Sequence, residues 1–200
     1  MERGKFIVFE GIDGSGKSTQ AKFLHEYLLE NGYKAILTTE PTKTEIGRFI
    51  RSNIAELKLG TYTIQLAFTA DRAEHVEKEI LPTLEKGISV VSDRYKHSTP
   101  AYGVLTGLPE DKINALYAAN APFPDSDITL LLDIDPRNAF LAQREKLESF
   151  ERKDHSDKDR MRNAYLRQCE ADKNCVKIDG YQRIEAVHDI VVKEVLKVLR

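Results

Sequence analysis

Glycines, a lysine and a serine near the start of the chain have the composition and spacing of a phosphate-binding loop. Residues 11–18 read GIDGSGKS and fit the pattern G-x-x-x-x-G-K-[ST]. Glycines let several backbone N–H groups point at one anion, and Lys17 adds a cation for the β and γ phosphates. An apolar run before the loop and a helical pattern after it supply the context that the motif requires. The sequence therefore predicts an ATP site, with contacts from Gly11, Ile12, Asp13, Gly14, Ser15, Gly16, Lys17, Ser18 and Thr19.

A phosphate loop of this kind works with Mg²⁺, which needs an acidic partner at the end of a neighbouring strand. The Ser18 hydroxyl is the ligand that the loop itself offers. Asp93 directly follows the apolar run 88–92, and Asp133, late in another apolar run, is its rival. Arg94 follows Asp93, so acid and base would meet where a metal–phosphate complex lies. We therefore expect Mg²⁺ as cofactor, held by Ser18 and Asp93.

Three features bear on the second substrate. Asp13 lies inside the loop, where a carboxylate repels phosphate and needs a donor partner such as a sugar hydroxyl or an arginine. Phe68 and Arg72 are four residues apart on an expected helix, so they could stack on a base and hydrogen-bond its edge. Taken alone, that pair is explained more simply as a core phenylalanine and a surface arginine. Finally, residues 93–95 are followed by a cluster of hydroxyls, Ser98, Thr99 and Tyr102.

Together these segments resemble the thymidylate kinase family over nearly the whole chain. The matching stretches are FEGIDGSGKSTQ, EPTKTEIG, FTADR, DRYKHSTPAY and IDGYQRIEAV. The resemblance implies transfer of the γ-phosphoryl group of ATP to dTMP, giving dTDP and ADP for dTTP synthesis. It also implies a homodimer whose partners are otherwise only the nucleotides ATP and dTMP.

The resemblance implies a role for each matching residue of the acceptor site. Phe68 would stack on thymine, Arg72 would hydrogen-bond its far edge, and Thr99 would face the base edge. Asp13 would meet the sugar 3′-hydroxyl, which explains a carboxylate in a phosphate-binding loop. Tyr102 would pack where a 2′-hydroxyl would sit, so deoxyribose is favoured.

The phosphates and the donor base involve further residues by the same resemblance. Arg94 would bind the acceptor phosphate. Arg144 would lie against the donor adenine, with residues 180–183 on its other side. Many family members read TREPGGT where this chain reads TTEPTKT, so the arginine is missing at Thr39. We assign the basic phosphate contact to Lys43 instead.

The acceptor is a phosphate oxygen, which needs no general base, so catalysis should rest on positioning and charge neutralisation. Some family members carry an arginine at the position of Gly14, but this loop has no arginine. By composition alone, the charged segment 148–162 is a solvated helix and turn. The missing charge favours a functional lid at 144–160, with Arg152 as first choice and Arg144 as second. The expected catalytic residues are Lys17, Asp93, Arg94 and Arg152.

Apolar strands alternating with helices must position these residues. The pattern predicts an α/β P-loop nucleoside monophosphate kinase fold, with a five-stranded parallel sheet, helices on both faces and a small lid, in one domain, 1–200. The expected strands are 6–9, 35–38, 88–92, 128–134 and 176–178. The expected helices are 17–31, 44–57, 62–86, 109–119, 136–147, 157–172 and 183–199.

The composition of the chain indicates its binding partners, its location and the state of its cysteines. The formal net charge is -2, from 30 basic and 32 acidic residues, which gives no sign of nucleic-acid or membrane binding. The sequence contains neither a signal-peptide core nor an apolar run of membrane-spanning length, so we expect a cytoplasmic protein. Two cysteines make no disulfide framework, and C-x₅-C matches no common metal spacing. Cys169 and Cys175 are therefore expected to be ordinary helix or strand residues in a reducing cytosol, without a redox role.

Two alternatives remain open at this point. A deoxynucleoside kinase, which must deprotonate a 5′-hydroxyl, would want a carboxylate just after the first strand, and Glu10 has a suitable position. Another nucleoside monophosphate kinase of the same fold belongs to this first alternative, and a nucleotide-dependent switch is the second. A nucleotide-dependent switch would leave the acceptor set without a purpose.

Overall fold

A parallel sheet forms the centre of the molecule in the computed structural model, which describes residues 2–56, 59–120, 122–139 and 155–199. Its five strands run in the order β2-β3-β1-β4-β5. All five expected strands are present, with ends shifted by at most one residue. Their bounds are β1 Phe6–Glu10, β2 Ala35–Thr39, β3 Ser89–Asp93, β4 Ile128–Asp133 and β5 Cys175–Asp179.

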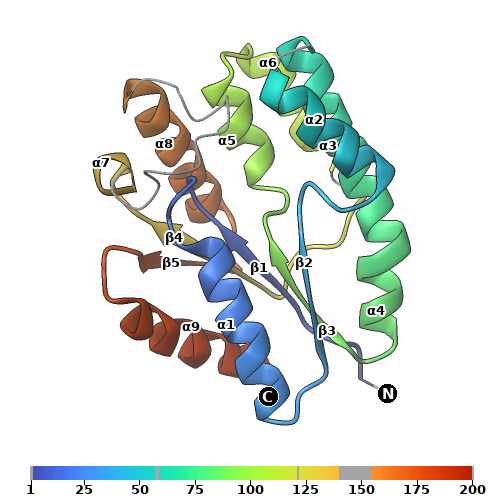
Figure 1. The fold of residues 1–200 in the computed structure, drawn as a ribbon, viewed down its shortest axis with the longest axis vertical. Coiled ribbons are helices and arrows are strands. Elements are labelled where there is room, and N and C mark those ends of the chain that lie inside the picture. Colours follow the sequence, from blue (N-terminus) through green and yellow to red (C-terminus); the bar gives the residue numbers. More distant parts are fainter. Residues whose placement is uncertain (1, 57–58, 121, 140–154, 200) are drawn as a thin grey trace.

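One face of the sheet is covered by α1 (Lys17–Glu30) and α9 (Ile184–Val198), which lie side by side (Figure 1). Both helices repeat apolar residues every three or four positions, so each presents one apolar stripe to the strands. The residues buried there join α1 and α9 to β1, β4 and β5; they include Leu24, Leu28, Val187, Val191, Phe9, Leu130 and Ile178.

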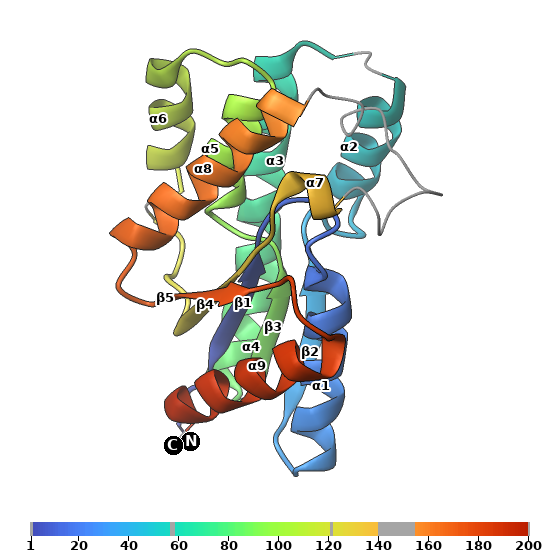
Figure 2. The same ribbon diagram turned by 90° about the vertical axis from the view of Figure 1, so that its left-hand side faces the viewer.

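The opposite face is covered by helices from the middle of the chain. Figure 2 shows α5 (Ser98–Leu105) and α8 (His155–Ala171) on the side of the sheet away from α9. Buried side chains from α5 and α8 pack on Leu131 of β4, and those of the helix before β3 pack on Phe6 and Val8 of β1. The expected architecture, a parallel sheet with helices on both faces, is confirmed. Three further helices are α2 Glu45–Glu56, α6 Glu110–Ala118 and α7 Pro136–Ala139.

The long helix expected at 62–86 is one continuous helical segment with a wide turn inside it. It consists of α3 (Thr61–His75), a π-helical turn η1 (Val76–Ile80) and α4 (Leu81–Glu85). The N–H of Leu81 bonds to the carbonyl of Val76, five residues back. Pro82 has no N–H and its ring would clash with the carbonyl four residues earlier, so an α-helical turn is disfavoured at this point.

Other helices differ from the expectation at particular places. α5 is not indicated by the sequence pattern because it is short and contains Pro100 and Gly103. The helix expected from 136 is described only as α7, and the remainder of 136–147 lies outside the described residues. The expected lid at 144–160 lies mostly outside them as well; its last residues, from His155, form the first turns of α8.

The expectation for the cysteines is wrong in one respect. Cys169, in the last turn of α8, and Cys175, at the start of β5, form a disulfide. A tight turn at residues 172–174 folds β5 back against the end of α8 and brings the two Cα atoms to 5.1 Å. That separation suits a disulfide, and spacing in the sequence alone could not reveal it.

The strand register gathers the chemistry at one edge. Phe9 of β1 lies opposite Asp93 of β3, and Glu10 lies opposite Leu131 of β4. The carboxyl ends of β1, β3 and β4 therefore meet, as in other open α/β sheets that bind ligands at this edge. Among the residues that the structure describes, no helix is long and apolar enough to cross a membrane.

Candidate active site

The phosphate loop joins β1 to α1 and has the backbone shape that its glycines allow. Gly16, with φ of 92°, precedes α1 in the left-handed region. At Gly11, a Cβ would lie 2.6 Å from the carbonyl oxygen of Leu132, so only glycine fits beside β4. The Lys17 ammonium is buried and donates to the carbonyl of Ile12 at 2.8 Å. Burial lowers its pKa to about 8, and nearby Arg94 acts in the same direction.

A metal could be held where the first turn of α1 meets the end of β3. The Ser18 hydroxyl donates to Oδ2 of Asp93, while Oδ1 of Asp93 is buried without a hydrogen-bond partner among the described residues. A hydroxyl beside a carboxylate oxygen that lacks a partner is a suitable donor set for Mg²⁺. Asp133 instead receives two hydrogen bonds from Arg162, at 2.6 and 2.9 Å. The structure thus brings Asp93, and not its rival, to Ser18.

Asp13 connects the phosphate loop to the other expected acceptor residues. Its carboxylate accepts a hydrogen bond and ion pair from Arg94 and a hydrogen bond from the Tyr102 hydroxyl at 2.7 Å. The Arg94 guanidinium also lies over the Tyr102 ring, 5.1 Å from its centroid. Burial by itself would raise the pKa of Asp13, but the charges of Arg94 and Lys17 hold it below its ordinary value. Asp13 therefore stays ionised.

Arg94 has an unusual backbone for a residue other than glycine, with φ of 81°. Its N–H bonds to the carbonyl of Phe9, and Ser92 Oγ donates to its carbonyl. This conformation turns the side chain back over the phosphate loop, where it also donates to the Tyr165 hydroxyl at 3.1 Å. A strained residue held by surrounding contacts often marks a functional site.

Glu10, the residue that a deoxynucleoside kinase could use as a base, is completely buried. Its carboxylate accepts from the N–H of Tyr95 at 2.8 Å, and from the N–H and hydroxyl of Ser98 at 3.2 and 2.7 Å. Burial raises its pKa. Because both oxygens anchor the turn between β3 and α5, this carboxylate does not face an acceptor, which disfavours the deoxynucleoside kinase alternative.

The Arg72 guanidinium is buried and has a protein acceptor at each nitrogen. Nε donates to Glu40 at 2.8 Å, NH1 donates to Thr99 Oγ1 and Asn120 Oδ1, and NH2 donates to the Tyr95 carbonyl. NH2 also lies 2.7 Å from Glu40 Oε2. The structure therefore joins Arg72 to Thr99, as expected of a shared base site. However, a base carbonyl would have to share or replace one of these acceptors.

Phe68, the expected stacking residue, is half-buried one turn before Arg72. Its ring centroid lies 6.3 Å from that of Tyr102. The two rings are tilted rather than parallel. The structure thus brings the stacking residue and the residue expected at the sugar to the same place, although they come from α3 and α5.

The segment 40–44 carries Lys43 and is held by α3. A cis peptide joins Glu40 to Pro41. The Asp71 carboxylate accepts from the N–H and the hydroxyl of Thr42. Lys43 is exposed and lines a cleft of about 700 Å³ that also reaches Ser18 and Asp93. The sequence indicated Lys43 but not the residues that hold its loop, although Glu40 and Asp71 lie inside the EPTKTEIG and FTADR stretches.

The expected donor-base side lies at the ends of β4 and β5. A cavity of about 280 Å³ is lined there by Asp133, Arg162, Asp179 and Tyr181. A Cβ at Gly180 would lie 3.3 Å from the carbonyl oxygen of Asp133, so this residue packs closely on β4. Arg144 and Arg152 lie outside the described residues.

The triphosphate loop thus opens onto a second polar cluster through its own Asp13, which is the layout of a P-loop kinase acting on a small phosphorylated acceptor. The chain belongs to the thymidylate kinase family, whose model matches residues 9–191. The probable thymidylate kinase of Pyrococcus abyssi is 39% identical over 204 residues, covering 95% of each chain. Thymidylate kinases of Caldanaerobacter subterraneus and Finegoldia magna are each 38% identical, covering 96% or more of each chain.

The family membership expected from the sequence is confirmed by these comparisons. The chain is accordingly a kinase enzyme, and its activity is that of the family, phosphoryl transfer to thymidylate.

Proposed function

We propose that this chain transfers the γ-phosphoryl group of ATP to dTMP through the site built around Asp13. One observation carries the proposal in detail: a carboxylate of the phosphate loop bonds to both Arg94 and Tyr102. A loop that bound only a triphosphate would gain nothing from an ionised acid among its N–H donors. An acid that meets an acceptor hydroxyl and orients a phosphate-binding arginine has a purpose in a two-substrate site.

The acceptor roles follow from this arrangement. Arg94 would bind the dTMP phosphate, and Asp13 would accept from the 3′-hydroxyl. The Tyr102 ring would occupy the space of a 2′-hydroxyl and so favour deoxyribose. Phe68 supplies the ring that would stack on thymine. Arg72 and Thr99, already hydrogen-bonded to each other, would face the base edge, and Lys43 would add a cation near the phosphates.

Ser18 and Asp93 would hold Mg²⁺, which neutralises charge on the β and γ phosphates when it is bound. The donor set fits that ion, since Oδ1 of Asp93 is buried and has no hydrogen-bond partner in the described part of the chain. The acceptor's own phosphate oxygen is the nucleophile, so the protein has only to position it and to offset developing charge. Lys17 serves the second purpose from the loop, and we assign the other cation to Arg152, with Arg144 against the adenine.

A coupled assay with ATP, Mg²⁺ and a panel of acceptors tests the proposal. We expect rapid ADP formation with dTMP and little with CMP, AMP or thymidine. The rate with dUMP measures how far recognition of the base depends on the methyl group of thymine. Comparable turnover with thymidine would favour a deoxynucleoside kinase. ADP formation at the same rate without any acceptor would indicate a nucleotide-dependent switch and contradict the proposal.

A homodimer and a cytoplasmic location remain parts of the proposal. Three large apolar side chains are exposed on the neighbouring helices α2 and α3: Phe49 (49%), Tyr62 (39%) and Leu66 (47%). Such a surface suits contact with a second copy. Light scattering after size exclusion should give twice the chain mass, and Leu66→Glu should give the monomer. The cytoplasm is expected because both substrates are charged nucleotides that do not cross membranes unaided.

A further inference from the structure

His75, the last residue of α3, lies between two carboxylates. It is only 2% exposed. Its Nδ1 lies 3.1 Å from Oε1 of Glu40, and its Nε2 lies 3.1 Å from Oε2 of Glu79 and 2.8 Å from Oγ1 of Thr38. None of these contacts involves the phosphate loop or the metal position. The role of this histidine is therefore not explained by the acceptor and donor sites described above.

The hydrogen-bond inventory fixes how many protons the imidazole carries. Nδ1 faces a carboxylate, which can only accept, so Nδ1 must be the donor. Thr38 has one hydroxyl proton, and it donates that proton to Glu79 at 2.7 Å. At Nε2, both neighbouring oxygens are therefore acceptors. With both ring nitrogens donating, the arrangement is that of an imidazolium.

Glu40 is the next link toward the acceptor site. It is 5% exposed, and its two oxygens are divided between two cations: Oε1 takes His75, while Oε2 takes Nε and NH2 of Arg72. A buried carboxylate with both oxygens paired in this way has little rotational freedom. Positive and negative charges alternate along this series of contacts, which runs from Glu79 through His75 and Glu40 to Arg72. Arg72 in turn donates to Thr99.

We propose that His75 is a positioning residue of the acceptor-base site: as a buried cation it fixes Glu40, and through Glu40 it fixes Arg72 and Thr99 in the orientation that binds the base. This inference rests on the proposed function, because it takes Arg72 and Thr99 as the residues facing thymine. It adds a residue that touches no substrate and a dependence of acceptor affinity on the proton of that residue.

The surroundings of His75 favour its charged form. Burial opposes the charge, but the hydrogen bonds to Glu40 and Glu79 raise its pKa to about 9. Glu40 is itself held by Arg72 below its ordinary pKa, against the effect of burial. Lys43 also faces Glu79. His75, Glu79 and Lys43 all line the cleft of about 700 Å³ that reaches Ser18. The other charged residues that line this cleft are Glu74, Lys78 and Asp93.

Loss of one ring proton from His75 would turn one of its two attractive contacts with carboxylates into a repulsive one. A neutral imidazole would present a lone pair to one of its two carboxylates, Glu40 or Glu79. Repulsion at the Glu40 side would free Oε1 and allow the carboxylate to rotate. Arg72 would then lose the geometry of its paired contact, and Thr99 would lose a fixed donor. Among the described residues, the phosphate loop and the donor-base side share no hydrogen bond or ion pair with His75, Glu40 or Glu79, so we expect ATP binding to be unaffected.

The first experiment separates affinity for the two substrates. His75→Gln keeps a polar side chain but cannot donate at both ends. We expect its Kd for dTMP, measured by calorimetry, to rise about tenfold, since one hydrogen bond to a charged group is lost. The Kd for ATP and the kcat at saturating dTMP should stay within about twofold of the wild type, a difference below 0.5 kcal/mol.

A pH series distinguishes a positioning cation from a residue that only fills space. The KM for dTMP of the wild type should rise near pH 9, where His75 loses its proton. Glu79→Gln removes one of the two carboxylates, so the rise should begin about one pH unit lower. Ionisation of the thymine ring is common to all variants, and the difference between variants is therefore the readout. In His75→Gln, the KM for dTMP should change between pH 7 and pH 9 only by the amount that thymine ionisation causes.

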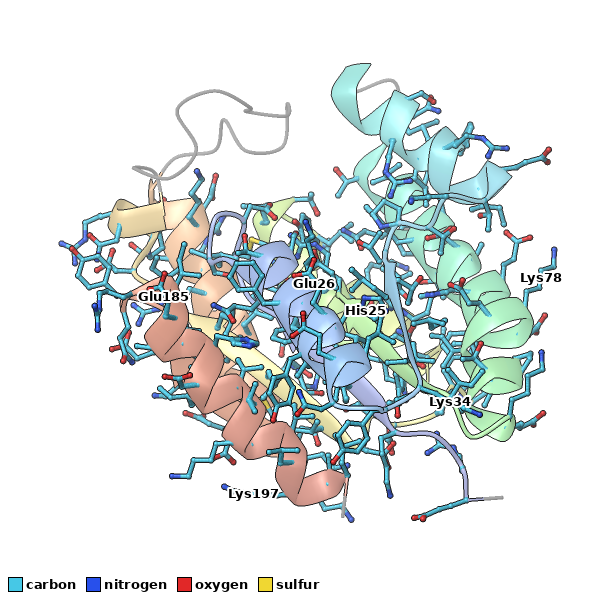
Figure 3. The ribbon with its side chains drawn as sticks, turned by 60° about the horizontal axis from the view of Figure 1, so that its bottom comes forward. His25, Glu26, Lys34, Lys78, Glu185 and Lys197 are labelled. Atoms are coloured by element: carbon cyan, nitrogen blue, oxygen red, sulfur yellow. A yellow bond between two sulfur atoms is a disulfide. The ribbon has the colours of Figure 1, made fainter. Side chains whose placement is uncertain are left out.

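Lys78 provides a matched control. It lies in η1, the π-helical turn that follows α3; it pairs with Glu74 at 2.5 Å, and its side chain is 71% exposed. Figure 3 shows its side chain pointing away from the body of the protein. Lys78→Gln removes a charge near His75 without changing any of its contacts. We expect both the KM for dTMP and its pH profile to match the wild type.

The outcomes separate the two proposals. A wild-type protein that does not phosphorylate dTMP refutes the proposed function, whatever His75 does. A wild type active on dTMP, with unchanged dTMP affinity in His75→Gln, refutes only the positioning role. If His75→Gln does not fold, ¹⁵N NMR of the wild-type imidazole decides: two protonated ring nitrogens at pH 7, with a titration that moves down in Glu79→Gln, support the inference. A neutral ring at pH 7 overturns it.

Discussion

Asp13 and Arg94 form an ion pair that joins the phosphate loop to the turn after β3. Two residues 81 positions apart in the chain thus hold each other in place, and the Tyr102 hydroxyl binds the same carboxylate at 2.7 Å. The pair is partly buried, with 25% of the Asp13 side chain and 15% of the Arg94 side chain exposed. The Asp13 side chain is therefore partly accessible, as contact with a sugar hydroxyl requires.

Asp13→Asn tests that relationship. The amide keeps the shape of the side chain but removes the charge that Arg94 and an acceptor hydroxyl would share. We expect the KM for dTMP to rise about 10- to 100-fold, because hydrogen bonds to charged groups contribute about 1.5–3 kcal/mol. The Kd for ATP, measured separately, should change much less. An unchanged KM for dTMP would contradict the assignment of Asp13 to the acceptor site.

Arg152→Ala tests the source of the catalytic cation. The phosphate loop contains no arginine, so a guanidinium from outside it must offset charge on the transferred group. Loss of such an arginine should lower kcat about 10³-fold or more. The Kd for dTMP should stay close to that of the wild type. Wild-type turnover would refute the role, and the same loss in Arg144→Ala alone would transfer it to that residue.

Arg72→Ala should affect both acceptor binding and stability. The substitution leaves the buried Glu40 carboxylate with only His75 as its cation, and breaking a buried pair costs about 3–5 kcal/mol. Urea unfolding should show that loss, while calorimetry should show weaker dTMP binding in the folded fraction. Arg48→Ala is a suitable control, since this arginine is exposed and its side chain donates to the Lys43 carbonyl rather than to a buried acid. Equal stability of Arg72→Ala and the wild type would contradict the network.

The charge on His75 predicts a pH dependence of stability. Its pKa is raised from the ordinary 6.5 to about 9 in the folded protein. The folded state therefore keeps a proton that the unfolded chain releases above pH 6.5, and the contribution is complete below that pH and lost as the pH rises to 9. An upper value for the loss is about 3 kcal/mol, because Glu79 is partly screened by solvent. Urea unfolding of the wild type and His75→Gln at pH 6 and 9.5 should show their difference shrinking; a constant difference would oppose the assignment.

The disulfide predicts a response to reductants. Cys169 and Cys175 close a short loop, and a cross-link over so few residues stabilises the folded state by about 2 kcal/mol. Reduction should therefore lower Tm by about 4–8 °C for a chain of this size. The double variant Cys169→Ser/Cys175→Ser should melt at the reduced Tm with or without dithiothreitol. A wild-type Tm that does not respond to reductant would show that the bond contributes nothing measurable.

The sequence contained enough information for the sheet and for the main chemical groups. Buried parallel strands appear as short apolar runs, and the phosphate loop has fixed spacing, so both could be recognised locally. The choice of Asp93 over Asp133 also followed from a local feature, the arginine that comes next. The π turn was not foreseen, although Pro82 gave a signal within the expected helix.

Long-range contacts could not be predicted in this way. Glu40 and His75 are 35 residues apart, and their pairing depends on how α3 packs against the loop after β2. The same reason applies to Cys169 and Cys175, whose contact depends on the direction of a turn rather than on spacing. For the Glu40 and Asp71 contacts, the local sign in the sequence was the presence of these two acids inside the stretches EPTKTEIG and FTADR.

The π turn gives one helical segment two different inner surfaces. A turn that holds one extra residue rotates everything after it by about 100° relative to an uninterrupted α-helix. Before the turn, Asp71 and His75 face the loop that carries Lys43, whereas after it Ile80 and Leu84 pack on the sheet. The same residues in an uninterrupted α-helix would therefore misalign the two surfaces, so the part of the helix that supports the substrate loop and the part that anchors it to the core could not dock together.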